Sequence, residues 1–103
     1  MNKKPKKINS MELLKKVKSA VESGNYLDST HAIERQAERK ILRPEMEDVL
    51  KNGWHEKSKD HFKSEYQAWN YAIRGKTMDE KEIRVIVSFE NKMLIITAID
   101  LSR

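Results

Sequence analysis

The spacing of apolar residues changes at Gly53, and this change most limits what the chain can fold into. Before Gly53 apolar residues recur every three or four positions, as in Leu14, Val17 and Val21, which is the spacing of one helix face. After it they alternate with polar residues, as in 83–89, which is the pattern of a half-buried strand. The sequence therefore predicts an α+β fold, with three N-terminal helices followed by a twisted antiparallel sheet of three or four strands.

Capping and turn residues set the expected boundaries of these elements. Ser10 suits a helix N-cap and Gly24 a helix stop. Ser29 or Thr30 offers a second N-cap, and Pro44 suits the first turn of a third helix. The expected helices are 11–23, 30–40 and 44–52. The expected strands are 66–75, 83–89 and 93–100, with a turn at 90–92 and a further candidate edge strand at 54–59.

The positive charge of the chain is concentrated at its start. Four of the 21 lysines and arginines lie in the first ten residues, and without them 17 basic side chains face 16 acidic ones. We therefore expect a flexible lysine-rich arm at 1–9 and a single α+β domain at 10–103. Because that domain is close to neutral, a phosphate-binding surface on it must come from the arrangement of its side chains.

Composition also excludes several classes of protein. The chain has no cysteine, which rules out disulfides, thiolate catalysis and cysteine-based metal sites. Lys15, Lys16 and Lys18 interrupt any signal-like segment, and no apolar run reaches the ~20 residues of a membrane span. No metal site or cofactor is expected, because an HExxH motif is absent and His55 and His61 have no carboxylate at a convincing ligand spacing. We expect a cytoplasmic protein without membrane contact.

The segment STHAIERQAERK, residues 29–40, aligns three basic side chains along one face of its expected helix. His31, Arg35 and Arg39 follow each other at intervals of four. If the apolar face of the same helix packs on the core, the basic face is free to meet a ligand. The residues expected on that apolar face are Ile33, Ala37 and Ile41.

Imidazole, guanidinium and ammonium groups suit the cleavage of RNA without a metal ion. The 2′-hydroxyl of RNA is the internal nucleophile, so such an enzyme needs a base, an acid for the leaving oxygen and cations for the phosphate. An unperturbed imidazole titrates at about 6.5, which makes His31 the candidate base. Arg35, Arg39 and Arg84 are the candidates for holding the phosphate through their guanidinium groups.

Some of these residues also have a structural interpretation. Arg35 and Arg39 lie near Glu34 and Glu38, so a solvated, ion-paired face is as well supported as a phosphate site. His31 can equally serve to assist the start of the helix.

Strand residues leave similar alternatives open. Arg84 lies on the strand face opposite Ile83, so its guanidinium must reach solvent, a carboxylate or a ligand phosphate. Trp54, Trp69 and Tyr71 can stack on bases, although aromatic residues at strand spacing more often belong to a core.

The run THAIERQAERKILRPEMEDVLKNGW resembles the opening of the DUF4258 family, in which a His is followed by two Arg, a short turn, an acidic helix and Asn-Gly. The later segments EIRVIVSF and MLIITAI lie where that family has its closing hairpin. The resemblance covers roughly residues 29–100. The chain departs from the family at Lys40, where Gly is common, and in the long stretch between Gly53 and Trp69.

The DUF4258 family is similar to the compact bacterial ribonuclease toxins of the RelE, BrnT and MqsR kind. Likeness to MqsR extends to AVESGNY, KSKDHFKSEYQAWNY and MLIIT. It implies a catalytic lysine near Lys57, an amide near Asn70 and a catalytic position near Arg84. The last catalytic lysine of that toxin falls near Ile99, which cannot replace it. The predicted RNA-binding residues are Asn70, Trp69, Tyr71 and Arg74.

Together, residues and resemblance predict a toxin of a bacterial toxin-antitoxin pair that acts as a metal-independent endoribonuclease on messenger RNA. The alternative is a non-enzymatic RNA- or protein-binding module of the DUF4258 type. The expected partners are RNA and an acidic antitoxin protein, because carboxylates can mimic phosphate in a basic site. The predicted catalytic set is His31, Arg35, Arg39, Lys57 and Arg84.

Overall fold

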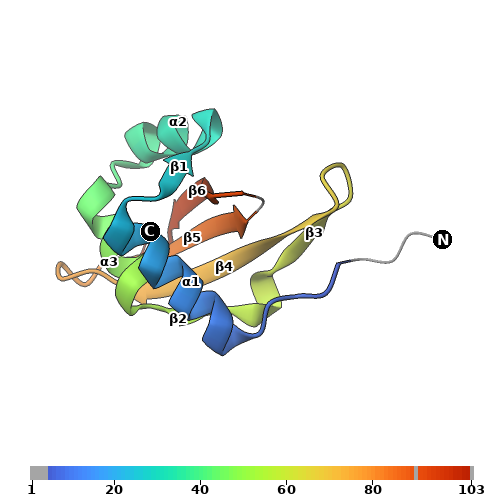
Figure 1. The fold of residues 1–103 in the computed structure, drawn as a ribbon. Helices are drawn as coiled ribbons and strands as arrows, with labels where there is room; N and C mark the ends of the chain where they lie inside the picture. The colour runs from blue at the N-terminus through green and yellow to red at the C-terminus, as the bar shows by residue number, and fades with distance from the viewer. Residues whose placement is uncertain (1–4, 90, 103) are drawn as a thin grey trace.

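The computed structural model describes residues 5–89 and 91–102 as a strongly twisted sheet with two helices packed on one face and a third along its end strands (Figure 1). The helices are α1 (Ser10–Ser23), α2 (Thr30–Arg39), α3 (Arg43–Asn52) and the 3-10 helix η1 (Lys57–Lys59). The strands are β1 (Tyr26–Asp28), β2 (Trp54–His55), β3 (His61–Lys63), β4 (Ala68–Lys76), β5 (Glu82–Phe89) and β6 (Met93–Asp100).

The sheet has strand order β1-β6-β5-β4-β2 among the described residues, and β3 pairs with β4 outside that path. Neighbouring strands are antiparallel except β1 and β6, which run parallel. Helices α1 and α3 pack on each other, α3 also packs on β4 and β5, and α2 lies along β6. One sheet face is therefore covered by two helices, while much of the other carries no helix (Figure 1).

The predicted fold, three helices followed by a sheet of three or four strands, is wrong in its order and its strand number. The protein is α+β, but its sheet has six strands, β1 lies between α1 and α2, and η1 lies between β2 and β3. The parallel pairing of β1 with β6 also departs from an all-antiparallel sheet. Strands of three residues are too short to show an alternating pattern, so only their pairing with a longer strand reveals them.

The core lies between the two covering helices and the inner face of the sheet. Alternate residues of β5 point inward, as predicted from their period of two. The inward-facing residues of β4 and β6 complete that surface, and α1 and α3 each contribute one apolar stripe. Fully buried side chains of this core include Leu13, Val17, Met46, Val49, Leu50, Ile73, Ile83, Val85, Val87, Met93 and Ile95.

Helix α2 faces the sheet with a different side from the predicted one. Ile33 is 57 % exposed and Ala37 is also exposed, whereas Ala32 is fully buried. Arg39 donates a hydrogen bond from Nη1 to the backbone oxygen of Ala98 at 2.6 Å. The helix lies along the end strands of the sheet rather than over its centre, so the small Ala32 makes the close approach while Ile33 and Ala37 stay outside. Of the predicted apolar face only Ile41, just beyond the helix end, is buried.

The passage from α3 into β2 depends on the close approach of two backbones. A Cβ atom on Gly53 would lie 2.5 Å from the backbone oxygens of Arg74 and Val49, closer than real Cβ atoms come. Gly53 therefore lets the end of α3 meet β4 directly.

Residues of the predicted N-terminal arm contact β4 where they are described. The backbone N–H of Ile8 donates to the Tyr71 hydroxyl at 3.0 Å, and Trp69 Nε1 donates to the backbone oxygen of Pro5 at 2.8 Å. Lys7 Nζ lies 2.6 Å from Asp60 Oδ2. Residues 1–4 of the predicted arm, and Glu90 of the predicted turn, lie outside the described residues.

Candidate functional site

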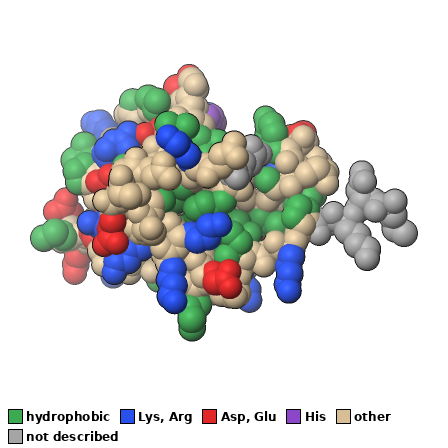
Figure 2. Space-filling model, viewed as in Figure 1, with side chains coloured by type: hydrophobic (Ala, Val, Ile, Leu, Met, Phe, Trp, Pro, Cys, Tyr) green, Lys and Arg blue, Asp and Glu red, His purple; other side chains and the backbone are tan. Residues whose placement is uncertain are grey.

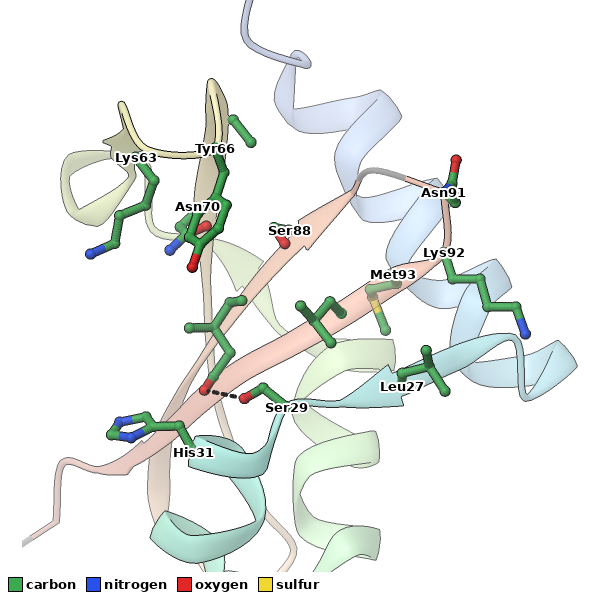
Figure 3. Close-up of a pocket in the computed structure, with 13 residues that line it drawn as sticks. Leu27, Ser29, His31, Lys63, Tyr66, Asn70, Ser88, Asn91, Lys92 and Met93 are labelled. Carbon is green, nitrogen blue, oxygen red and sulfur yellow. Dashed lines mark hydrogen bonds between the residues drawn. The ribbon is translucent and has the colours of Figure 1, made fainter.

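A groove of about 870 Å³ lies on the sheet face that α1 and α3 do not cover. Its size falls in the range of about 300 to 1,000 Å³ usual for small-ligand sites. In Figure 3 its side chains project from the near side of the sheet, with α1 and α3 behind. The polar side chains that line it include those of Ser29, His31, Lys63, Tyr66, Asn70, Ser88 and Lys92.

The floor of the groove comes from residues that alternate with core residues. Tyr71 pairs with Val87 and both point into the core, so Asn70 and Ser88 beside them point to the opposite face. Asn70 is only 8 % exposed and Ser88 only 6 %. Leu94, which pairs with Ser88, and Ile96 add apolar surface. The floor therefore combines two nearly buried polar side chains with aliphatic ones.

One wall comes from the turn that joins β3 to β4, which projects beyond the rest of the sheet (Figure 1). Lys63 ends β3, and the turn is closed by a 2.8 Å hydrogen bond from Gln67 Nε2 to the backbone oxygen of Ser64. Gln67 has a positive φ of 50°, which bends the chain sharply. Tyr66, just before it, is 71 % exposed. The turn thus holds an aromatic ring over the groove.

The other wall comes from the start of α2. Ser29 is the N-cap: its Oγ accepts from the N–H of Ala32 at 2.9 Å and donates to the backbone oxygen of Ile96 at 3.0 Å. The bond to Ile96 attaches the helix start to β6 (Figure 3, dashed line). His31, two residues later, is exposed and lines the groove. The cap thereby fixes the backbone from which the imidazole projects.

The groove carries positive charge without a described carboxylate. Lys63 and Lys92 line it, and no Asp or Glu is among its described lining residues. Within the described part of the chain, the side chains of His31, Lys63, Tyr66 and Asn70 make no hydrogen bond or ion pair. Their polar groups are therefore available to a ligand. On the face shown in Figure 2, by contrast, described Lys and Arg side chains are spread among acidic and apolar ones.

Arg84 and Arg74 lie elsewhere on the open sheet face, on either side of one carboxylate. Arg84 donates to Glu56 through Nε at 2.6 Å and Nη2 at 3.1 Å. Arg74 Nη1 donates to Glu56 at 2.9 Å, and its Nη2 lies 3.1 Å from Glu82. The hydrogen bond from Arg84, and next that from Arg74, hold the pKa of Glu56 below its ordinary value although burial opposes this. Hydrogen bonds to Glu82 and then Glu56 raise the pKa of Arg74.

This cluster predicts an acid-dependent loss of stability. Since the pKa of Glu56 is lower in the folded chain than its ordinary 4.5, its stabilisation is complete above about pH 4.5 and is lost as pH falls through the folded value. We expect the free energy of unfolding of Glu56→Gln to fall less steeply than wild type between pH 5 and about pH 3. Urea unfolding at several pH values measures this, with exposed Glu34→Gln as the control. Equal slopes for wild type and Glu56→Gln would contradict the assignment.

The structure brings two of the predicted site residues, His31 and Asn70, to the groove. Arg35 pairs with Glu38 at 2.7 Å, and Arg39 binds the backbone of β6. Lys57 is exposed on η1. None of these three lines the groove among the described residues, and neither does Arg84. The predicted meeting of the basic helix face with Lys57 and Arg84 in one groove is therefore not seen.

The four predicted RNA-binding residues also do not lie together in the structure. Tyr71 is buried in the core, and Trp69 is half-buried against the N-terminal segment, with Lys7 Nζ 4.9 Å from its ring centre. Arg74 has its guanidinium 5.9 Å from the ring centre of Trp54. Of the four, only Asn70 lines the groove.

Sequence reasoning missed Lys63, Tyr66, Ser88 and Lys92. Along the sequence they stand 4 to 22 residues from the nearer of His31 and Asn70, and they follow no motif. One local signal exists for Tyr66, because an aromatic residue between Glu65 and Gln67 in a polar turn has no core to join. The others are found only through the pairing of strands.

A second cluster, of Ser10, His55 and Asp60, has the residue types of a hydrolase triad. Ser10 Oγ lies 2.7 Å from His55 Nδ1, and His55 Nε2 lies 2.7 Å from Asp60 Oδ2. The side chains of His55 and Asp60 are each only 1 % exposed. A substrate cannot reach this imidazole, so the cluster ties α1 to β2 and η1.

Among the described residues, no helix is long and apolar enough to cross a membrane. No group of three or more His, Asp or Glu side chains in the same residues is arranged to hold a metal ion.

Comparison with known proteins gives one match. A family model described as "Domain of unknown function (DUF4258)" matches residues 29–100, most of the chain. The match begins at the N-cap Ser29 and ends with β6, so it includes both walls and the floor of the groove. No curated protein and no solved structure matches the chain.

Proposed function

Because this chain belongs to the DUF4258 family, which carries no assigned function, we propose its function from the groove that the family match spans. The protein is a metal-independent endoribonuclease that acts on messenger RNA as the toxin of a bacterial toxin-antitoxin pair. The likeness of several segments to the RelE, BrnT and MqsR toxins is part of this proposal, and it supplies the messenger RNA substrate and the antitoxin.

One observation carries the proposal. An exposed imidazole, a lysine ammonium, a phenol and a nearly buried amide line a single groove, and none of them is engaged by another described side chain. This set supplies a base, a proton donor and positive charge around one cavity, which are the groups that cleavage by the 2′-hydroxyl requires. The lack of a described carboxylate in the lining favours an anionic ligand.

The proposed reaction uses only these side chains and the RNA itself. A ring nitrogen of His31 accepts the proton of the 2′-hydroxyl, and the 2′-oxygen forms a bond to the adjacent phosphorus. The bond from phosphorus to the 5′-oxygen breaks, and the Lys63 ammonium donates a proton to that leaving oxygen. The products are a 2′,3′-cyclic phosphate and a 5′-hydroxyl. In the view of Figure 3, the ammonium of Lys63 and the imidazole of His31 lie toward the same end of the groove.

The proposal predicts cleavage of single-stranded RNA that persists in excess chelator. Since every group in the reaction belongs to the chain or the RNA, the rate with EDTA should equal the rate without it. Gel separation of a 5′-labelled RNA measures the rate, and phosphatase treatment with and without acid identifies a cyclic phosphate end.

A folded protein that leaves RNA intact would overturn the enzymatic proposal, and so would cleavage that EDTA abolishes. The toxin role has its own test, since induced expression in bacteria should arrest growth together with loss of messenger RNA. Growth arrest without RNA cleavage would separate the two parts of the proposal.

A non-enzymatic RNA- or protein-binding module is the second candidate, and a specific observation favours it. Arg35, Arg39, Arg74 and Arg84 are all engaged by carboxylates or backbone oxygens, which leaves few cations for a transition state. The role of these arginines in phosphate binding stays a prediction. Retained RNA binding in filter assays, with no cleavage by wild type, would favour the module.

A further inference from the structure

We propose that the groove holds one unpaired nucleobase of the RNA, stacked on the ring of Tyr66 and read at its edge by Asn70 and Ser88. This inference rests on the proposed function and deepens it, because it gives the ribonuclease a base preference. The base belongs to the nucleotide next to the phosphate that lies between Lys63 and His31.

The first step is the exposed ring of Tyr66. A tyrosine that is 71 % exposed on a projecting turn contributes little to the core, and its side chain makes no hydrogen bond or ring contact with the described residues. An exposed aromatic face is the usual platform for an unstacked base, because every base has a flat π surface. Since Tyr66 lines the groove, a base stacked on it enters the cavity.

The floor of the groove carries the polar groups that would read the edge of the base. Asn70 is 8 % exposed, yet its amide makes no hydrogen bond to any described residue. Its amide atoms still meet solvent in the open groove, so a ligand that enters there can supply the missing hydrogen-bond partners. The amide offers both donors and acceptors, and the Ser88 hydroxyl on the neighbouring strand offers one more of each. This pattern matches the polar edge of a base.

The third step is the match of shape and charge. Leu94 and Ile96 line the same groove, so a flat base has aliphatic surface to cover as well as the Tyr66 ring. Lys63 and Lys92 supply positive charge for the flanking phosphates, without a described acid in the lining. A cavity of about 870 Å³ is large enough for a nucleotide.

Cleavage of a single-stranded RNA pool of random sequence tests the proposal, with the cut ends identified by sequencing. Wild type should prefer one or two of the four bases at a fixed position beside the cut. Asn70→Asp, which replaces the amide donors with an acceptor, should change that preference. Tyr66→Ala should raise KM by about 5- to 150-fold with kcat changed by less than about threefold.

Matched variants separate stacking from general damage. Tyr66→Phe keeps the ring and should reverse most of the rise in KM that is expected of Tyr66→Ala. Trp54→Ala removes an aromatic residue of comparable exposure, 53 %, away from the groove, and should behave as wild type. An unchanged base preference in Asn70→Asp together with an unchanged KM in Tyr66→Ala would overturn the base site while leaving the ribonuclease intact.

A binding measurement distinguishes failure of the base site from failure of catalysis. The side-chain amide signals of Asn70 in an NMR spectrum of wild type are followed while AMP, GMP, CMP or UMP is added. Selective shifts by one or two nucleotides support the base site, even if RNA is not cleaved. Equal responses to inorganic phosphate, or a response only to an acidic peptide, would overturn it, and the second result would assign the groove to a protein partner.

Discussion

Replacing His31 with alanine is expected to reduce the rate of RNA cleavage by about 10²- to 10⁴-fold, the usual contribution of a positioned general base. Binding should be retained, because Lys63 and Lys92 still supply charge. The imidazole is exposed and bonds to no described residue, so the free energy of unfolding should change by less than about 0.5 kcal/mol. Single-turnover cleavage rates and thermal melts of the same protein measure both quantities.

His61→Ala is the matched control for this experiment. His61 is an exposed histidine on β3, outside the groove lining, so its loss tests whether any exposed imidazole matters. It should cleave RNA at the wild-type rate. If His31→Ala cleaves as fast as His61→Ala, the base lies elsewhere. If His31→Ala loses more than about 2 kcal/mol of stability, the histidine is a structural tie of the helix start.

Arg84→Ala is expected to lower the free energy of unfolding by about 3 kcal/mol, the low end for breaking a buried ion pair, because Arg74 still faces the carboxylate. The side chains of Arg84 and Glu56 are 15 % and 8 % exposed, so the remaining Glu56 would be poorly solvated. Urea unfolding at pH 7 measures the change.

Arg35→Ala provides the comparison within the same chain. Arg35 also pairs with one glutamate, Glu38, but on an exposed helix face, where such pairs are worth about 0 to 1 kcal/mol. Similar stability losses for Arg35→Ala and Arg84→Ala would contradict this account. If Arg84→Ala is as stable as wild type but no longer binds RNA, Arg84 is a phosphate ligand, as predicted from the sequence.

Local sequence patterns were sufficient to predict the type and bounds of an element wherever that element is long enough to show its own hydrophobic period. Helix α1 was predicted at 11–23 and lies at 10–23, and Gly24 is its C-cap as predicted. Its N-cap is Asn9 rather than the predicted Ser10, and the Asn9 side chain accepts from the N–H of Glu12. Strand β6 was predicted with its observed bounds, since eight residues between turn signals establish a strand by themselves. The family membership also follows from sequence, because residue types and spacings define it.

Such patterns could not predict the short strands or the side of a helix that faces the sheet. Tyr26–Asp28 becomes β1 only because β6 supplies backbone partners, and three residues carry no visible period. The helix from Thr30 to Arg39 has two plausible inner faces, and the choice depends on where β6 lies beside it. The predicted apolar face was therefore assigned to the core although Ile33 is exposed.

The sequence by itself determined the types of the longer elements, the family, and the chemical inventory of imidazole, guanidinium and ammonium groups without thiols. Only the tertiary structure decided which of these groups are free. Arg84 is held by Glu56, 28 residues away, while His31 and Asn70 reach one groove from different elements. Local sequence fixes the period and the caps, but the register between strands decides which distant side chains meet, and that register depends on packing of the whole chain.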